Sequence, residues 1–497
     1  MADHVEVRRG VYYDSVTLMQ ISRTVAAAPG VVAAQVAMAT ELNLEVIQGM
    51  GFTIPDGTLP NDLVIAIRAQ NDSVDGGLAA MEDALTARST PGSAADGTNQ
   101  APPRPRTLGR AIRTAHATLA VISVPGGNAA VEAFDAIDQG VSVMLFSDNV
   151  PVDQEIALKD AARARDVLLM GPDCGTAVIG GVSLGFANVV RRGPIGIVAA
   201  SGTGAQQVMC LLDAADVGMS HCLGVGGRDL SSAVAGRSTR QALAALATDP
   251  ATDSILVVSK PPAPEVLAAL ESTANSLGKQ VHWATLGAGR PDLTAAVEAM
   301  LIAEGHDVPS WPEWPVDQLP APSGYLRGLF CGGTLADEAM LVAGDQLGGI
   351  RSNIPLQPEL ALPHDLKADD HLVIDFGDDG MTQGRPHPMI DPSLRIERIH
   401  QEAADDACAV LLLDLVLGHG AHADPADELA EAITEAKTAA RQRGRELPVV
   451  ISLTGTAGDP QGLEHCATTL HAAGAAVFLS NARATRHALS LLPRKDA

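Results

Sequence analysis

Short apolar runs alternate with longer amphipathic runs along most of the chain, and most apolar runs end in a turn of glycine, proline or small polar residues. Short runs rich in Val, Ile and Leu predict buried strands, whereas apolar positions recurring three and four residues apart predict helices. Strands that alternate with helices at this spacing predict parallel sheets with right-handed crossover connections. The pattern therefore predicts a multi-domain α/β fold.

The clearest strand–turn–helix unit lies at residues 194–207, PIGIVAASGTGAQQ. Residues 195–199 are predicted to form a buried strand and residues 205–212 a helix. The first backbone N–H groups of a helix lack partners and carry partial positive charge, so the turn between them offers an anion-binding site. An ordinary turn in which a serine caps the helix explains the pattern equally well. The residues of the turn are Ser201, Gly202, Thr203 and Gly204.

The first 88 residues have a pattern of their own, with strands and helices in the order β-α-β-α-β-α. This order predicts a small α+β or ferredoxin-like module. It carries no catalytic motif, and we interpret it as an assembly or packing domain. Residues 89–108 are rich in Pro, Gly, Ser and Ala, which predicts a flexible linker. The expected elements of the module are 5–13, 15–28, 31–39, 42–50, 62–69 and 74–87.

A first series of strand–helix units occupies residues 109–193 and predicts a truncated Rossmann-like domain. The turn after its first strand lies at a carboxyl end, where open α/β sheets bind ligands. Residues 171–181 are so rich in glycine that we expect a loop there. The turn consists of Pro125, Gly126, Gly127 and Asn128. The expected strands are 118–124, 141–146 and 167–170, and the expected helices are 129–139 and 153–165.

Two further α/β domains are predicted, at residues 194–310 and 324–497, with a proline-rich boundary between them. Lys260 follows an expected strand of the first, where it either neutralises a phosphate or is solvated. Another candidate binding loop of that domain, after the expected strand 220–225, consists of Gly226, Gly227 and Arg228.

The last domain opens with a second strand–turn–helix unit. A strand is expected at 324–330 and a helix at 335–344, and the turn between them again consists of small residues. This turn is therefore a second candidate anion site. Its residues are Gly332, Gly333 and Thr334.

The composition narrows the class of function. A chain of 497 residues is long enough for several domains, since single cores seldom grow beyond about 300 residues. The formal net charge of −25 argues against a nucleic-acid or anionic-membrane surface. The six cysteines are scattered without a zinc-like spacing, which favours free thiols in a reducing compartment. Without a membrane-length apolar run or an N-terminal signal core, we expect a cytoplasmic protein.

Some charged side chains outside the turns are candidates for chemistry. Arg385 and His387 lie together in a proline-flanked segment after a group of aspartates, and we interpret them as catalytic residues. The alternative is a rigid loop in which Arg385 pairs with Asp391. Arg228 is expected either to pair with Asp229 or to bind a carboxylate substrate. We expect no metal site, because two histidines lack a third ligand and because a solvated loop explains the aspartates better than its alternative, a magnesium site. These residues are His419, His422, Asp375, Asp378 and Asp379.

Several ordered motifs between residue 118 and the C-terminus resemble the succinyl-CoA synthetase superfamily. The segments VPGGNAAVEAFDAIDQG, GPDCG, GIVAASGTGAQQV and GVGGRD are similar to successive motifs of its α subunit, and CGGTLADEAM is similar to a turn and helix of its β subunit. More narrowly, CGGTL, residues 375–379 and GRPHPMIDP resemble the FdrA family of acyl-CoA synthetases. The resemblance implies a Rossmann-like CoA-binding-type domain, with Pro125–Asn128 as a CoA-like loop, and two flavodoxin-like ligase domains.

In those synthetases two helix N-termini face one phosphate on a phosphorylated histidine. The resemblance implies that Ser201–Gly204 and Gly332–Thr334 are those two sites. This chain departs from the pattern, because the phosphohistidine loop, its supporting glutamate and an ATP-grasp domain have no match. Two anion sites without a relay suit transfer from an acyl phosphate, whose leaving phosphate they would hold. FdrA-like proteins are associated with a multi-subunit carbamoyltransferase that acts on oxamate and carbamoyl phosphate.

We therefore expect an enzyme subunit that transfers an acyl or carbamoyl group to a small molecule, works with other subunits and forms an oligomer. Carbamoyl phosphate or another acyl phosphate is the expected substrate, and no cofactor is certain. One alternative is a nucleotide-dependent acyl-CoA synthetase, which would use CoA and ATP. The other is a non-catalytic scaffold or regulatory subunit that keeps the fold as a binding module.

Overall fold

The computed structural model describes residues 1–9, 11, 13, 15–55, 57–70, 73–89, 105–317, 323–382 and 385–492. The described residues divide into two compact units. The first holds the described residues up to Ser89 together with Arg385 and Pro386, and the second holds the remainder from Pro105 onward. Most of the linker expected at 89–108 lies outside the described residues.

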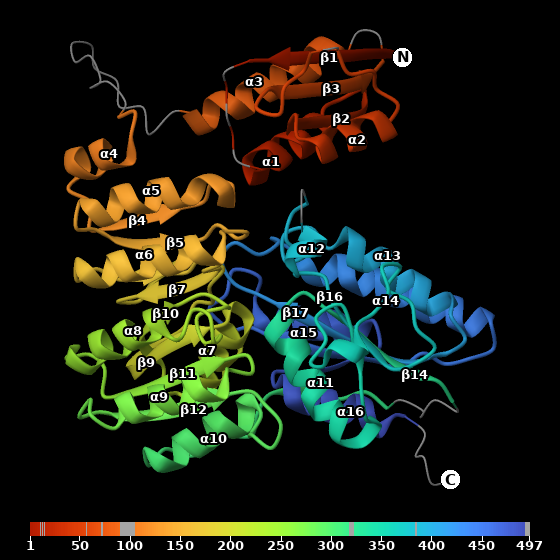
Figure 1. Cartoon of the computed structure of the whole chain (residues 1–497). Coiled ribbons are helices and arrows are strands. Elements are labelled where there is room, and N and C mark those ends of the chain that lie inside the picture. Colours follow the sequence, from red (N-terminus) through yellow and green to blue (C-terminus); the bar gives the residue numbers. More distant parts are fainter. Residues whose placement is uncertain are drawn as a thin grey trace. The chain divides into compact units, whose positions relative to one another are not determined.

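The first unit is a three-stranded antiparallel sheet in the order β1-β3-β2, with helices on both faces (Figure 1). Alternate residues of β3 point to opposite faces, so Ile65 and Ile67 pack with α1 and α3, whereas Val64 and Ala66 pack with α2. The element order is the predicted one. The bounds are β1 (Ala2–Arg8), α1 (Ser15–Ala26), β2 (Val31–Met38), α2 (Glu41–Gly49), β3 (Leu63–Ala69) and α3 (Val74–Ser89).

The second unit begins with a parallel three-stranded sheet, β4-β5-β6. Its strands alternate with helices, as the apolar pattern predicts, and β5 and β6 are largely buried, whereas Val121 of β4 is exposed. The short helix α4 precedes the first strand and was not predicted. The bounds are α4 (Leu108–Ala115), β4 (Leu119–Ile122), α5 (Gly126–Asp138), β5 (Ser142–Leu145), α6 (Val152–Ala164) and β6 (Leu169–Met170).

A six-stranded sheet follows in the order β12-β11-β9-β10-β7-β8, and its last two strands are β7 (Thr176–Ile179) and β8 (Val182–Gly185). Its first four strands are parallel, and β9 lies between β10 and β11. The helix α7 therefore starts at the carboxyl edge of a central strand. The bounds are β9 (Arg192–Ala200), α7 (Gly202–Ala214), β10 (Met219–Gly224), α8 (Arg237–Thr248), β11 (Ser254–Ser259), α9 (Pro264–Ala274), β12 (Gln280–Thr285) and α10 (Leu293–Ala303).

The loop expected at 171–181 is wrong for part of that segment. The strands β7 (Thr176–Ile179) and β8 (Val182–Gly185) form a hairpin, and β7 pairs antiparallel with β10. Gly180 and Gly181 have φ of +57° and +81°, so they form the tight turn between the strands. The glycines mark a hairpin rather than an irregular loop.

The last sheet has seven strands in the order β13-β19-β18-β17-β14-β16-β15, all parallel to their neighbours except β13. Its central strand β14 leads into α11, as β9 leads into α7. The bounds are β13 (Glu313–Trp314), β14 (Tyr325–Phe330), α11 (Gly333–Leu347), β15 (Arg351–Ser352), β16 (Leu372–Asp375), α12 (Asp379–Thr382), α13 (Ser393–Ala404), β17 (Cys408–Val416), α14 (Pro425–Gln442), β18 (Val449–Thr454), α15 (Leu463–Ala472), β19 (Ala476–Phe478) and α16 (Asn481–Ser490).

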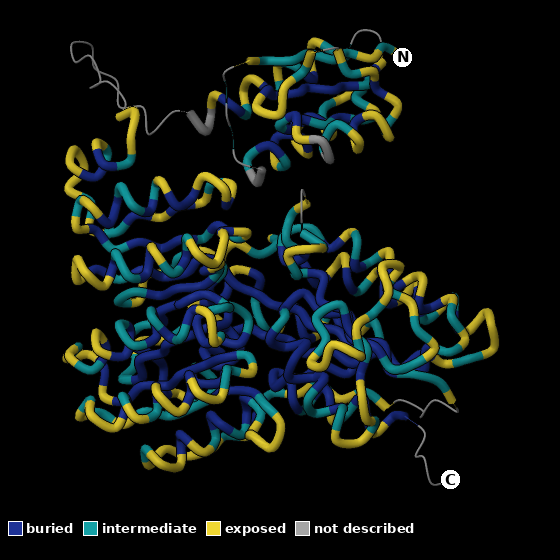
Figure 2. The backbone as a smooth tube through the Cα atoms, in the orientation of Figure 1, coloured by how far each residue is buried: buried dark blue, intermediate teal, exposed yellow. Residues whose placement is uncertain are grey.

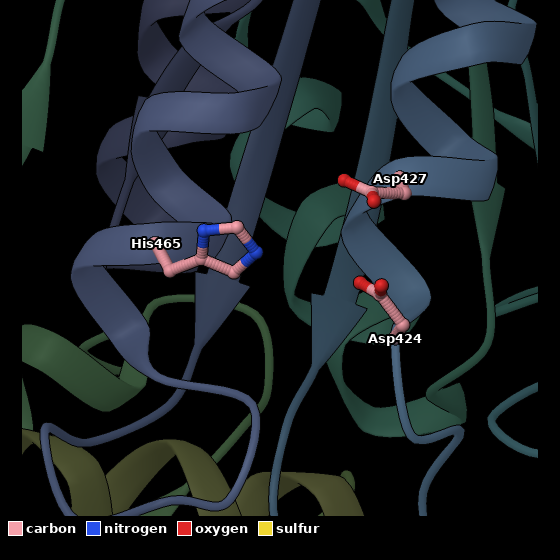
Figure 3. A group of neighbouring side chains, drawn as sticks. All are labelled: Asp424, Asp427 and His465. Atoms are coloured by element: carbon pink, nitrogen blue, oxygen red, sulfur yellow. The ribbon is translucent and has the colours of Figure 1, made fainter.

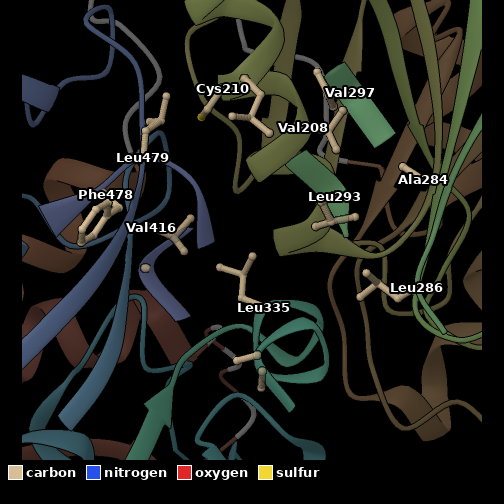
Figure 4. Packing of buried hydrophobic residues seen from close by; sticks show 14 of the residues in the cluster. Val208, Cys210, Ala284, Leu286, Leu293, Val297, Leu335, Val416, Phe478 and Leu479 are labelled. Carbon is tan, nitrogen blue, oxygen red and sulfur yellow. The ribbon is translucent and has the colours of Figure 1, made fainter. Parts of the chain in front are cut away.

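One hydrophobic cluster joins the six- and seven-stranded sheets. It contains Val208 and Cys210 of α7, Leu293 of α10, and Leu335 of α11 (Figure 4). The strands of this unit are largely buried, while the outer faces of its helices are exposed (Figure 2). Because the two sheets share one packed core, the turns at their edges are held in a fixed relation.

The α/β fold predicted from the sequence is thus confirmed. The described part of the chain contains no helix that is both long and apolar enough to cross a membrane. All six cysteines are buried and free of disulfides, as the scattered spacing predicts.

Candidate functional site

The turn after β9 is held by the hydroxyl of Ser201. This residue is the N-cap of α7, and its Oγ accepts a hydrogen bond of 2.9 Å from the backbone N–H of Gly204. The same hydroxyl donates a bond of 2.7 Å to Oγ1 of Thr334, which lies in the first turn of α11. Ser201 therefore acts as a cap and also links the two turns that the sequence singled out.

Gly204 and Gly332 allow the two turns to touch. A Cβ atom on Gly332 would lie 2.6 Å from Oγ1 of Thr203, and one on Gly204 would lie 2.8 Å from Cγ2 of Thr334. Real Cβ atoms do not approach other atoms so closely, so glycine is needed at both positions. The N-termini of α7 and α11, which belong to different sheets, thus lie against each other.

The buried carboxylate of Asp414 accepts one of the backbone N–H groups just before α11. Oδ1 of Asp414 accepts a bond of 2.8 Å from the N–H of Cys331 and one of 2.7 Å from Nη1 of Arg395. Asp414 and Arg395 are both buried. The N–H of Cys331 therefore points into the protein, and the α11 donors nearest to the surface are those around Gly333, which is partly exposed.

Lys260 follows β11 and lies beside the first residue of α11. A Cβ atom on Gly333 would lie 2.8 Å from Nζ of Lys260 and 2.6 Å from Oδ2 of Asp375. Burial acts to lower the pKa of Lys260, but the carboxylates of Asp337, Asp375, Asp173 and Asp378 raise it on balance. The lysine is therefore charged at neutral pH, and it is partly buried rather than solvated.

The carboxylates around Lys260 carry more negative charge than one lysine neutralises. Burial raises the pKa of Asp375 and of Asp173 to about 7, and that of Asp337 to about 6. Asp375 is only 3% exposed, so the interpretation of this segment as a solvated loop is wrong for Asp375, whereas Asp379 is exposed. The site therefore holds groups that exchange protons near neutral pH.

His387 lies next to Asp375, one of the carboxylates around Lys260, and its imidazole ring is neutral. Its Nδ1 accepts a bond of 3.3 Å from the N–H of Met389, and burial, followed by the charge of Arg395, lowers its pKa to about 4. The proton of the neutral ring therefore sits on Nε2. A Cβ atom on Gly377 would lie 2.7 Å from Nε2 of His387 and 3.2 Å from Oδ1 of Asp375, so these two side chains are neighbours.

Arg385 is exposed and belongs to the first compact unit, whereas His387 belongs to the second. The joint catalytic role expected for this pair stays a prediction. Asp391, the alternative partner of Arg385, accepts a bond of 3.0 Å from the N–H of Ser393.

Arg228 and Asp229 do not pair with each other, contrary to the first of the two expectations. Nη2 of Arg228 lies 3.0 Å from Oε2 of Glu155. Asp229 instead pairs with Nζ of Lys159 at 2.7 Å and accepts the N–H of Thr239 at the start of α8. These contacts fix the positions of Arg228 and Asp229, while the binding role expected of Gly226, Gly227 and Arg228 stays a prediction. The glycines before them also serve packing, because a Cβ atom on Gly226 would lie 2.2 Å from the carbonyl oxygen of Pro172, while Gly227 lies beside Asp173.

The turn Pro125–Asn128 starts α5 at the carboxyl edge of the three-stranded sheet. Gly126 is buried and lies against the backbone of Asp148 and Asn149, where a Cβ atom would clash. Gly127 and Asn128 are exposed. Burial, followed by the charges of Asp379 and Asp148, raises the pKa of Asp173, so Asp148, which lies beside this turn, is close enough to act on the carboxylates near Lys260.

Sequence reasoning missed Asp337 and Thr176. Asp337 lies inside a helical run, where an acidic residue is unremarkable, and no motif marks it. Thr176 was overlooked because the glycines around it predicted a loop. Its side chain is 2% exposed and its Oγ1 has no hydrogen-bond partner among the described residues. A threonine followed by three apolar residues, TAVI, is the signal that indicates a strand there.

One group of side chains in the described part of the chain has a spacing that a metal ion could use. Ligand atoms of Asp424, Asp427 and His465 lie within 4.8 Å of one another, at the starts of α14 and α15 (Figure 3). All three residues are exposed, and exposed acidic groups of this kind are common without an ion. We assign no role to them.

Two family models match the chain. Residues 1–102 match the AllF heavy metal-associated domain, and residues 329–491 match the CoA-ligase domain. The six cysteines all lie after residue 173, so the first match lacks the thiolates that soft heavy metals prefer. The N-terminal residues therefore do not fit such an ion through cysteine ligands.

The YahF protein of Escherichia coli K12 is 39% identical over 501 residues, which cover 95% of each chain. The α subunit of an Aquifex aeolicus succinate–CoA ligase is 29% identical over 160 residues, which cover 31% of this chain and 51% of that subunit. Among solved structures, this chain is similar to a dinucleotide-forming acetyl-CoA synthetase from Candidatus Korarchaeum cryptofilum in complex with phosphate and ADP. The two are 16% identical, and the matched region covers 75% of this chain and 82% of the synthetase chain. Its TM-score of 0.28 is too low to bear on the site.

Proposed function

Since this chain belongs to the same family as YahF, an FdrA-type family within the succinyl-CoA synthetase superfamily, we propose that it transfers an acyl or carbamoyl group from an acyl phosphate. Its CoA-ligase domain and its α-subunit relatives support an enzyme of the ligase or synthetase type. Carbamoyl phosphate is the donor that we assign. The relatives are subunits by name, and we propose that this chain also works with other subunits in a cytoplasmic, oligomeric enzyme.

The contact between the N-termini of α7 and α11 carries this proposal. The hydrogen bond from Ser201 to Thr334 holds the two helix starts together, and Lys260 lies beside Gly333 at the same place. Two helix N-termini and an ammonium group favour a bound anion. No histidine motif accompanies them, so the anion that we assign is the phosphate of the substrate rather than a phosphorylated side chain.

These groups would act by holding the leaving phosphate. The acceptor nucleophile attacks the carbonyl carbon, the bond from that carbon to the phosphate oxygen breaks, and phosphate leaves with the electron pair. The donors at Gly202, Thr203 and Gly333, with Lys260, stabilise the charge that grows on the phosphate. The proton of the acceptor passes to a base.

Asp375 is the base that we assign. Its pKa of about 7 suits proton transfer near neutral pH. His387 lies next to it and is neutral at that pH, so its Nε2–H can donate a hydrogen bond to Asp375 or to the substrate carbonyl. The catalytic role expected of Arg385 stays a prediction, because Arg385 belongs to the other compact unit.

Replacing Thr203 tests the assignment. Thr203→Leu places an apolar group against the contact with Gly332, and we expect carbamoyl phosphate turnover by the native assembly to fall at least about a hundredfold, the loss of one to two strong anion contacts. The double variant with Thr334→Leu should abolish it. Thr248→Leu, at an exposed threonine at the end of α8, serves as the matched control. Unchanged turnover in a folded Thr203→Leu variant would refute the proposal.

The match to the CoA-ligase model favours a second candidate, a nucleotide-dependent acyl-CoA synthetase. In that case the turn Pro125–Asn128 would bind CoA, and a histidine would carry phosphate from ATP. His282, the histidine nearest in sequence to the missing motif, is bonded to Glu304 at 2.7 Å. Incubation with γ-labelled ATP should then label a histidine and support thioester formation. A chain that stays unlabelled while the assembly consumes carbamoyl phosphate argues for the first candidate.

A further inference from the structure

Thr176, in β7, carries a buried hydroxyl without a hydrogen-bond partner in the described part of the chain. The residue is 2% exposed, and its Oγ1 lacks a hydrogen-bond partner among the described residues. Buried polar groups are almost always paired, and leaving a hydroxyl unpaired costs free energy. An apolar residue of similar shape, such as valine, would fill the position without that cost. The hydroxyl therefore calls for a partner that is not part of the protein.

This hydroxyl borders the first residue of α7. A Cβ atom built on Gly202 would lie 3.6 Å from Oγ1 of Thr176 and, apart from Ser201, Thr203 and the nearby backbone of α7, no other described atom comes within 4 Å of it. Gly202 is itself partly exposed. An atom at the position of that Cβ would thus be a direct neighbour of the hydroxyl of Thr176, which is itself almost inaccessible to water.

The other groups at this place are donors. Ser201 cannot serve a ligand freely, because its Oγ already accepts from Gly204 and donates to Thr334. The backbone N–H groups at the start of α7 have no partners within the helix. A ligand atom beside Gly202 therefore meets N–H donors and the O–H of Thr176, and the matching atom is an oxygen that only accepts, such as an oxygen of a phosphate.

We propose that Thr176 is a further substrate-binding residue, whose hydroxyl donates a hydrogen bond to a phosphoryl oxygen of an acyl phosphate bound beside Gly202. The inference rests on the proposed function and adds a named group to it. It explains why threonine, rather than valine, stands in a buried strand at this position. The adjoining helix N-terminus supplies positive potential, so the preferred ligand is anionic.

Binding of inorganic phosphate, and of sulfate as a second probe, to the full chain tests the inference by calorimetry. Thr176→Val removes the hydroxyl and keeps the shape, so the dissociation constant for phosphate should rise on the order of tenfold or more, as for loss of a hydrogen bond to a charged group. Thr176→Ser keeps the hydroxyl and should bind within a few-fold of the original chain. The melting temperature of Thr176→Val should be equal or higher, because no internal hydrogen bond is lost. A purely structural threonine predicts the reverse, with lower stability and unchanged phosphate binding.

Gly202→Ala offers a second variant. The added methyl group meets Thr176 at an ordinary contact distance, so the chain should fold. The methyl group also occupies the space assigned to the ligand, so it should weaken phosphate binding at least as much as Thr176→Val does. Phosphate binding that is absent from the original chain, or unaltered in both Thr176→Val and Gly202→Ala, overturns the inference. The turnover test on Thr203 is read separately. Loss of turnover there, with unaltered binding here, rejects Thr176 and keeps the proposed function.

Discussion

Individual buried ionisable groups make the stability of this chain depend on pH, and Glu338 of α11 is a clear case. Its carboxylate accepts bonds from the N–H of Leu293 and from Nδ2 of Asn481. Burial, reinforced by Asp292, nevertheless raises its pKa to about 7. The glutamate therefore holds its proton in the folded chain at pH values where the unfolded chain has released it.

The sign of the resulting pH dependence follows from linkage. Between the ordinary pKa of 4.5 and about 7, the folded state binds more protons than the unfolded state, so stability falls as pH rises. Full stability from this group is present below the unfolded pKa and is lost as pH rises through the folded one. The free energy of unfolding should fall as pH rises from 5 to 8. We expect Glu338→Gln to make the slope of this fall less steep by up to about 1.4 kcal/mol per pH unit. Denaturant titrations across this range measure the slope, and an unaltered slope would contradict the assignment.

Lys159 of α6 forms a second residue-scale test. Its ammonium group is fully buried and pairs with Glu155 at 2.9 Å and with Asp229 at 2.7 Å. Lys159→Met removes the buried ammonium group from both carboxylates and leaves Glu155 with only the half-exposed Arg228 as an ionic partner, so we expect a loss of about 3–5 kcal/mol in the free energy of unfolding. Arg163→Met, on the same helix, is the control, because the ion pair of Arg163 with Asp160 is largely exposed and should contribute less than about 1 kcal/mol. Similar losses of stability in both variants would contradict a stabilising role for the buried contacts of Lys159 with Glu155 and Asp229.

At the scale of elements, the sequence was informative wherever an apolar run ended in a recognisable turn. The two strand–turn–helix units at β9–α7 and β14–α11 were predicted within a few residues, and the strand β10 was predicted within one residue at each end. The glycine-rich hairpin of β7 and β8 was missed. Its strands are short, and glycine is equally typical of loops and tight turns.

The contact between the two turns was beyond prediction from local patterns. It depends on how two sheets pack, and the residues that meet, Ser201 and Thr334, lie 133 positions apart. The gathering of carboxylates around Lys260 could not be predicted for the same reason, because Asp173, Asp337 and Asp375 lie in different parts of the chain. No sequence spacing records such an arrangement, and only the shared core brings it about.

Two glycines, Gly332 at the N-cap of α11 and Gly344 inside that helix, provide an element-scale prediction. Gly332→Ala would place a Cβ atom 2.6–2.8 Å from Thr203, so the two helix starts must separate. We expect a loss of at least about 1–3 kcal/mol in stability, the cost of overpacking a tight contact. Gly344→Ala, in the same helix, meets nothing within 4 Å and should stabilise the chain by about 0.5–1 kcal/mol. Thermal unfolding of the pair measures both, and equal effects would contradict the close contact.

At the scale of the whole molecule, the site joins the edges of two sheets that share one core, and its net charge sets when an anion can bind. Asp173 and Asp375 have pKa values of about 7, and Asp148, Asp378 and Asp379 add further negative charge, against Lys260 and Arg228. Protonation of the first two carboxylates removes repulsion from an incoming anion.

We therefore expect anion binding to tighten as pH falls. Sulfate is the suitable probe, because its own charge does not change over this range. Its dissociation constant should decrease at least about tenfold from pH 8 to pH 6, the effect of removing one to two nearby like charges. Asp375→Asn should reduce this dependence, and Lys260→Met should weaken binding at both pH values. A dissociation constant that is independent of pH would contradict the assignment of the anion to this group of residues.

The central claim is that the N-termini of α7 and α11 jointly hold the phosphate of the substrate. A crystal structure of the full chain with inorganic phosphate at near-neutral pH tests it most directly. We predict density for one phosphate within hydrogen-bonding distance of the backbone at Gly202 and Gly333, of Nζ of Lys260 and of Oγ1 of Thr176. A saturated crystal in which phosphate binds elsewhere, and this place stays without it, would contradict the claim.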